Sequence, residues 1–295
     1  MSTAELINEQ IRTLARPDGA RVGYGVLRGE ARRPLLVLAH GMGSNMTRWS
    51  EFFEQTTLKA SWDLLRFDMR GHGRSIWRGR VGMESWSDDL AAILDAEHYE
   101  RAVVGGNCLG ANFALHFVHR YPRRTAGLVL IEPMPLEALA GPLRSLRWLA
   151  PLLGLAAGGI RALNALGLHR RQLPFLDLEA LDKASRAAMR QDPQAISRLY
   201  ASPLFDLRFM PSAAYLQDLL ELWRPVRLDT IAAPALALPS TGAHFTDPAL
   251  AEEALRALPN LTLERIAALH WIPTEQPQQM REAIERWCER LRGGL

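Results

Sequence analysis

The fold is decided by Ala102-Val103-Val104-Gly105-Gly106-Asn107-Cys108-Leu109-Gly110-Ala111. This stretch begins as a short apolar, β-branched run and continues as an apolar helical pattern that reaches Tyr121. Gly106 and Gly110 predict a tight turn in which strand and helix approach closely, with Cys108 at its tip. A cysteine at a helix N-terminus favours the thiolate, the reactive form of the side chain. We therefore predict a strand, a sharp turn and a helix that together present a nucleophilic cysteine.

Short apolar runs alternate with helical patterns on both sides of this stretch, which predicts an α/β fold with a mostly parallel sheet flanked by helices. The turns that follow these strands are rich in glycine and polar residues, so chemistry is expected at that edge of the sheet. A closing helix is predicted from Pro277 to Leu291. The predicted strands are Leu35 to Ala39, Leu64 to Phe67, Ala102 to Gly105, Leu128 to Ile131, Pro234 to Leu238 and Leu261 to Ile266.

The alternation stops after Pro133, and residues 134–228 read as several short helices rich in Leu, Ala and Arg. We predict that this segment is a helical lid inserted into a core made of residues 1–133 and 229–295. The segment holds 12 Lys and Arg against 8 Asp and Glu, an excess of +4 that exceeds the net charge of +3 for the whole chain. No basic stripe interleaved with aromatic residues accompanies this charge, so we expect no nucleic-acid partner.

Composition and cysteine usage exclude several further classes of protein. A chain of 295 residues with 48% hydrophobic and 23% charged content can bury a full core, which excludes disorder. Cys108 and Cys288 have no metal-type spacing, so we expect no metal site, no disulfide and a reducing, cytoplasmic location. The N-terminus has no secretory pattern. In the apolar middle the longest uncharged run, Trp148 to Ile160, has 13 residues, so we expect no membrane span.

Three further motifs lie in turns or loops of the predicted core. They are His40-Gly41-Met42-Gly43, Asp68-Met69-Arg70-Gly71-His72-Gly73-Arg74-Ser75, and Leu269-His270-Trp271-Ile272-Pro273 followed by Glu275-Gln276-Pro277. Together with the G-x-C-x-G turn, these motifs resemble the α/β-hydrolase superfamily over nearly everything outside the inserted segment. Four matches in the right order are far more specific than one. The resemblance implies an α/β-hydrolase fold and an enzyme.

The resemblance also implies roles for matching residues. Cys108 would be the nucleophile, where most relatives of this fold use serine, and His270 the general base. The backbone N–H groups of Met42 and Leu109 would form the oxyanion hole. Candidate pocket residues are Asn107, Trp271 and His244, although His244 could equally have a structural role in its own turn.

Members of this superfamily complete a catalytic triad with a carboxylate that orients the histidine. The position of this acid departs from the commonest pattern here, because Ser240-Thr241-Gly242-Ala243-His244 has no carboxylate where most relatives place one. Glu132 ends the preceding strand, a position from which a subset of the superfamily, similar to certain haloalkane dehalogenases, takes its acid. We therefore predict a triad of Cys108, Glu132 and His270, with Asp247 as the reserve acid. Glu132 could instead cap the strand end or pair with an arginine of the insertion.

A cysteine nucleophile implies a thioester intermediate, which is open to amines and thiols as well as water. A cysteine at the tip of this turn resembles three groups within the superfamily. They are dienelactone hydrolases, polyhydroxyalkanoate synthases and the shuttles that move acyl or aminoacyl groups between carrier proteins. The length and the basic insertion resemble the shuttles best, with a phosphopantetheine or coenzyme A thioester as substrate, an acidic carrier protein as partner and no bound cofactor. The alternative is a thioesterase, an ester hydrolase or a lactone hydrolase with the same mechanism.

A binding protein without activity would require both Cys108 and His270 to be incidental. The acyl group and the oligomeric state stay open.

Overall fold

The computed structural model describes residues 9–192 and 194–294. Its strands form one eight-stranded sheet in the order β1-β2-β4-β3-β5-β6-β7-β8. β1 and β2 pair antiparallel, as do β2 and β4, and the other neighbours are parallel. The strands are β1 (Gln10–Ala15), β2 (Arg21–Leu27), β3 (Leu35–Ala39), β4 (Asp63–Phe67), β5 (Ala102–Asn107), β6 (Thr125–Ile131), β7 (Ala235–Leu238) and β8 (Leu261–Leu263).

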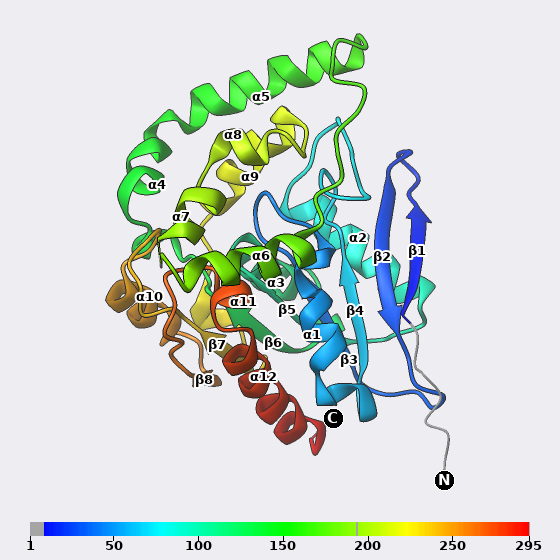
Figure 1. The fold of residues 1–295 in the computed structure, drawn as a ribbon. Helices are drawn as coiled ribbons and strands as arrows, with labels where there is room; N and C mark the ends of the chain where they lie inside the picture. The colour runs from blue at the N-terminus through cyan, green and yellow to red at the C-terminus, as the bar shows by residue number, and fades with distance from the viewer. Residues whose placement is uncertain (1–8, 193, 295) are drawn as a thin grey trace.

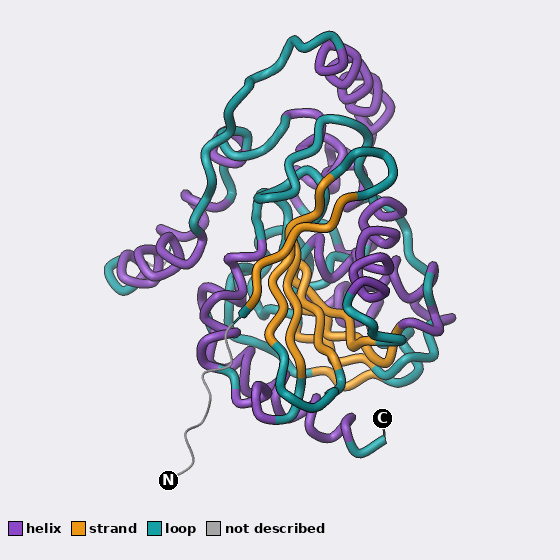
Figure 2. Tube along the Cα trace, turned by 90° about the vertical axis from the view of Figure 1, so that its right-hand side faces the viewer, coloured by secondary structure: helices purple, strands orange, loops and turns teal. Residues whose placement is uncertain are grey.

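Helices cover both faces of this sheet, as Figure 2 shows for the orange strands between purple helices. Neighbouring residues of β5 point to opposite faces, so Val104 packs with α2 and α3 whereas Val103 packs with α1 and α12. The helices are α1 (Ser50–Gln55), α2 (Met83–Ala96), α3 (Leu109–Arg120), α4 (Gly141–Leu146), α5 (Ala150–Ala165), α6 (Leu178–Met189), α7 (Ala195–Tyr200), α8 (Pro203–Asp206), α9 (Ser212–Leu222), α10 (Pro248–Leu255), α11 (Ile272–Glu275) and α12 (Pro277–Arg292).

The predicted fold class is confirmed, since the predicted strands all lie in the parallel part of the sheet. The hairpin of β1 and β2, which extends the sheet at one edge, was not foreseen. The last strand is also shorter than predicted, because β8 ends at Leu263 and Ile266 contributes only an isolated bridge to Ser240.

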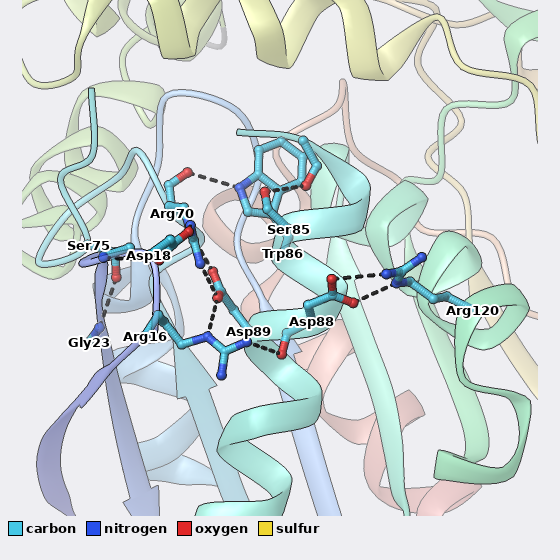
Figure 3. A network of polar contacts seen from close by, with 12 residues as sticks. Arg16, Asp18, Gly23, Arg70, Ser75, Ser85, Trp86, Asp88, Asp89 and Arg120 are labelled. Carbon is cyan, nitrogen blue, oxygen red and sulfur yellow. Dashed lines mark hydrogen bonds and ion pairs between the residues drawn. The ribbon is translucent and has the colours of Figure 1, made fainter. Parts of the chain in front are cut away.

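The turn after β4 is fastened to α2 by the arginine of its R-G-x-G motif (Figure 3). Arg70 donates to Asp89 of α2 at 2.9 Å, and the indole of Trp86 donates to the Arg70 carbonyl at 2.9 Å. Asp68 accepts from the backbone of Met46 at 2.6 Å and of Arg74 at 2.7 Å. The side chains of Asp68 and Arg70 therefore shape the turn.

Helices α4 to α9 lie between β6 and β7, in the segment predicted as an insertion. In Figure 1 they form an arc above the sheet, with α5 at its outer edge. Among the described residues, one helical run, Gly141–Ala165, is long and apolar enough to cross a membrane by length and composition alone. Only 6% of its most apolar 18-residue window is buried. The uncharged part of this run, Trp148 to Ile160, is too short to span a bilayer by itself.

Candidate active site

Cys108 occupies the tip of the turn between β5 and α3 in a conformation that side chains rarely adopt, with φ 54° and ψ −118°. Its backbone N–H donates to the Ile131 carbonyl at 3.0 Å, which fixes the turn against β6. A Cβ atom at Gly106 or at Gly110 would come within 2.4 Å of the Ala39 carbonyl oxygen. The two glycines are therefore required for the close approach of strand and helix that holds the sulfur at the apex.

His270 and Glu132 meet beside this turn. Nδ1 of His270 lies 3.4 Å from a carboxylate oxygen of Glu132, and both side chains are buried. Glu132 also has a positive φ of 46°, and its carboxylate accepts from the Ser240 backbone N–H at 2.6 Å and the Thr246 hydroxyl at 3.2 Å. The carboxylate is thus fixed in place by two donors while it faces the imidazole.

The surroundings of His270 favour its charged form. Burial acts to lower the pKa of His270, but the contacts with Cys108 and Glu132 outweigh burial and raise the pKa to about 10. The loop that carries the imidazole is held by Glu275, whose carboxylate accepts from the backbone N–H groups of Leu269, His270 and Trp271 at 2.8, 3.0 and 2.7 Å. The carboxylate of Glu275 therefore positions the histidine without facing its ring.

Cys108 and His270 line a cavity of about 500 Å³. Leu109 is the first residue of α3, so no carbonyl of the helix accepts a hydrogen bond from its backbone N–H. Met42 lines the cavity wall. The lining is largely apolar and comes from both the core and the inserted helices. The lining includes Met42, Arg48, Asn107, Cys108, Met134, Leu143, Leu146, Tyr200, Asp206, Phe245, His270 and Trp271.

The remaining predicted site residues fall in different places. Asn107 and Trp271 line the cavity. His244 is not among the lining residues, and its ring packs against Phe245 and Trp271, with centroids 4.4 and 4.9 Å apart. Asp247 is exposed and accepts from two backbone N–H groups at the start of α10. The structure thus brings Glu132, and not Asp247, to His270.

Several residues at the cavity were not predicted. The sulfur of Met134 lies 3.2 Å from that of Cys108. Arg48, from the short 3₁₀ helix that follows β3, is buried and contacts Asp182 of α6. Asp206 of α8 lines the cavity, and burial followed by the charge of Asp218 raises its pKa to about 8. No local sequence pattern indicates these positions, because their place at the site depends on contacts between the insertion and the core. Within residues 9–192 and 194–294, no group of three His, Cys, Asp or Glu side chains could hold a metal ion.

Curated relatives match parts of this chain. A dihydrolipoyllysine-residue acetyltransferase component of the acetoin cleaving system from Pseudomonas putida is 33% identical over 132 residues, which cover 42% of this chain and 35% of that protein. The chain thus spans little more than a third of the first such relatives, 35% and 38%. An sn-1-specific diacylglycerol lipase from Mus musculus is 20% identical over 89% of this chain and 83% of its own length.

A solved structure and a family model match most of the length of this chain. An enol-lactonase from Burkholderia xenovorans LB400 superposes with a TM-score of 0.69 at 17% identity, covering 94% of this chain and 100% of that one, which shows the shared fold. The family model described as "Serine aminopeptidase, S33" (Hydrolase_4) matches residues 30–276. The family is described by a serine, whereas this chain has Cys108 at the tip of its turn. A match over most of the length means that the chain belongs to this family of the α/β-hydrolase superfamily.

Proposed function

We propose that this protein is a hydrolase of carboxylic esters or thioesters that acts through an acyl thioester on Cys108. The observation that supports the proposal is the meeting of a strained cysteine, a buried histidine and a fixed carboxylate at one cavity. A nucleophile, a base and a residue that orients the base are the parts that covalent acyl transfer needs.

In the proposed reaction, Nε2 of His270 takes the thiol proton, because Nδ1 faces Glu132, and the raised pKa of His270 keeps that proton on the imidazole while the sulfur attacks. The sulfur attacks the substrate carbonyl, and the backbone N–H groups of Leu109 and Met42 stabilise the oxyanion. The tetrahedral species collapses to the acyl thioester, and the leaving alcohol or thiol takes the proton from His270. Water, deprotonated by His270, then attacks the thioester, which restores the thiol and releases the carboxylic acid.

The cavity favours an apolar acyl group, because Leu143, Leu146, Phe245 and Met134 form much of its wall. The inserted helices supply part of this wall, so we propose that they act as a lid over the site. The names of two relatives, a diacylglycerol lipase and an enol-lactonase, describe hydrolysis of ester bonds and support this class of reaction.

The test is intact-mass measurement after mixing the protein with medium-chain p-nitrophenyl esters and acyl-pantetheine thioesters. A covalent acyl adduct is expected in the wild-type protein and is expected to be absent in Cys108→Ala. In His270→Ala the adduct should form slowly and persist, because the base for both half-reactions is gone. An adduct of equal yield in Cys108→Ala would overturn the proposal.

A second candidate is transfer of the acyl group to a pantetheine thiol, with coenzyme A or an acidic carrier protein as donor or acceptor. The basic composition of the insertion, with 12 Lys and Arg against 8 Asp and Glu, is the observation that favours it. Chasing the isolated adduct with buffer alone or with pantetheine separates the two. Release in buffer as fast as with the thiol supports the hydrolase, and release only with the thiol supports transfer.

A further inference from the structure

One face of α5 and its flanks is apolar and exposed. Trp148 is 76% exposed, Leu152 63% and Leu155 75%. These positions are four and three residues apart, and Leu163 and Leu166 continue the same face one and two turns beyond the exposed Gly159. Large side chains left in water over this length mark an interaction surface.

The opposite face of α5 packs on the protein. Ala157 is fully buried, and a Cβ atom at Gly154 would lie 3.9 Å from the Leu220 side chain of α9. Arg161 donates to Gln217 of α9 at 3.3 Å, and Asn164 donates to the Arg78 carbonyl at 3.4 Å. A helix held by polar contacts along one side presents its other side to a surface and does not pass through a bilayer as an isolated span.

The charge around this face has one sign. From position 138 to position 176 the chain carries five arginines and no Asp or Glu. None of the five forms an ion pair with a carboxylate in the part of the chain that the structure describes, and Arg147 lies over the Trp148 ring at 5.0 Å. Arg161 and Arg170 are engaged with the protein, at the Gln217 side chain and at the carbonyl groups of Leu207 and Met210. The arginines that flank the exposed face are therefore Arg144, Arg147 and Arg171.

We propose that the exposed face of α5, together with the arginines that flank it, docks on an anionic lipid bilayer. An apolar face with an exposed tryptophan and unpaired basic residues is what binding in the plane of a membrane interface requires. Each basic residue near an anionic surface adds electrostatic attraction. An acidic protein surface would match the arginines but would leave Leu152 and Leu155 facing polar groups.

Docking in this orientation brings the membrane next to the cavity. α4, which immediately precedes the docked face, supplies Leu143 and Leu146 to the cavity wall. This step rests on the proposed function, and it names the substrates as esters of long-chain lipids taken from the bilayer. The docking itself does not depend on the chemistry of Cys108.

The experiment is vesicle co-sedimentation of the full chain carrying Cys108→Ala, which keeps the surface and removes the proposed nucleophile. Vesicles are phosphatidylcholine alone or phosphatidylcholine with about 30% phosphatidylglycerol. We expect the protein to bind the anionic vesicles and to bind the neutral vesicles about tenfold or more weakly. Binding to the anionic vesicles should be lost when salt rises to about 1 M, where the Debye length falls to ~3 Å. The double variant Leu152→Glu/Leu155→Glu should lose about tenfold or more in binding.

Leu250→Glu is the matched control, because Leu250 is an exposed leucine on α10, away from α5, and its variant should bind as the parent does. If the double variant fails to fold by circular dichroism, Arg144→Ala/Arg147→Ala replaces it and should bind more weakly with a shallower salt dependence. Equal binding by parent and variant, or binding to neither vesicle, overturns the proposal. So does a wild-type oligomer that the double variant converts to monomer, because a second copy would then cover the face. With the wild-type protein, vesicle binding without ester hydrolysis would refute the proposed function and leave the docking intact.

Discussion

Replacing Glu132 by glutamine is the sharpest test of the triad, because the change keeps the shape and removes only the charge. The Ser240 backbone N–H donates to one carboxylate oxygen at 2.6 Å, so the glutamine must turn its carbonyl oxygen to that donor. Its NH₂ group then faces the Thr246 hydroxyl and Nδ1 of His270. A donor at Nδ1 favours the tautomer with hydrogen on Nε2, which cannot accept the thiol proton.

The expected loss can be bounded from the same contacts. A hydrogen bond to a charged group is worth about 1.5–3 kcal/mol, and each ~1.4 kcal/mol changes a rate about tenfold. Glu132→Gln should therefore lower kcat/KM about 10- to 150-fold, and a preference for the wrong tautomer adds to this loss. The variant should also lower the pKa of His270, which Glu132 helps to raise to about 10.

Two measurements check this prediction. Initial rates on a p-nitrophenyl ester give kcat/KM, and NMR titration of the His270 ring follows its pKa. Asp247→Ala is the control, because Asp247 only caps α10 and its loss should cost about 1 kcal/mol of stability with activity unchanged. The reasoning is refuted if Glu132→Gln keeps activity within threefold of the wild type, or if Asp247→Ala loses activity and Glu132→Gln does not.

Three further predictions follow from the site. Gly110→Ala should lower the free energy of unfolding by about 3 kcal/mol or more, measured by urea denaturation, because the new Cβ meets backbone oxygens at 2.4 and 2.6 Å. Glu275→Ala should lower kcat about tenfold, because the backbone N–H groups of the His270 loop lose their acceptor. Glu275→Gln should keep more of the activity, since its amide oxygen still accepts from part of the loop, and equal rates in both variants would contradict the positioning role. The wild type should lose stability as the pH rises from about 4 to 8, because the pKa of Asp206 is raised to about 8 and the unfolded chain releases this proton earlier. Asp206→Asn removes this loss, so the Tm advantage of the variant over the wild type should grow between about pH 4 and pH 9, and a constant difference would contradict it.

The central sheet could be predicted because its signals are local. β3 was located to the residue, and the turn at Cys108 follows from glycines that the approach of Ala39 requires. The hairpin was missed because β2 has the sequence Arg-Val-Gly-Tyr-Gly-Val-Leu, and two glycines weaken a strand pattern. The structure supplies the reason for one of them, since a Cβ atom at Gly23 would come 2.8 Å from the Cβ of Arg74.

The part of the site that the insertion supplies could not be predicted, because its contacts join residues far apart in the chain. Arg48 contacts Asp182, 134 positions away, and His72 contacts Asp218, 146 positions away. His72 helps to shape its own turn, since Nδ1 of its ring lies 3.3 Å from the Met69 carbonyl oxygen. The structure adds a second role, because Nε2 of His72 lies 2.8 Å from a carboxylate oxygen of Asp218 on α9.

These long-range contacts also distinguish two parts of the insertion, because within the described ranges only one of them is tied to the core by ion pairs. α6 is tied to the core through Asp182 and Arg48, and α9 through Asp218 and His72, and all four side chains are buried. Breaking a buried charged pair costs about 3–5 kcal/mol, so α6 and α9 should stay seated when substrate enters. α4 and α5 have no ion pair to the core among the described residues, although α4 lines the cavity and α5 carries the exposed apolar face. Access to Cys108 should therefore depend on displacement of α4 and α5, the same helices that a bilayer would contact, so that binding to lipid and opening of the site act on one element.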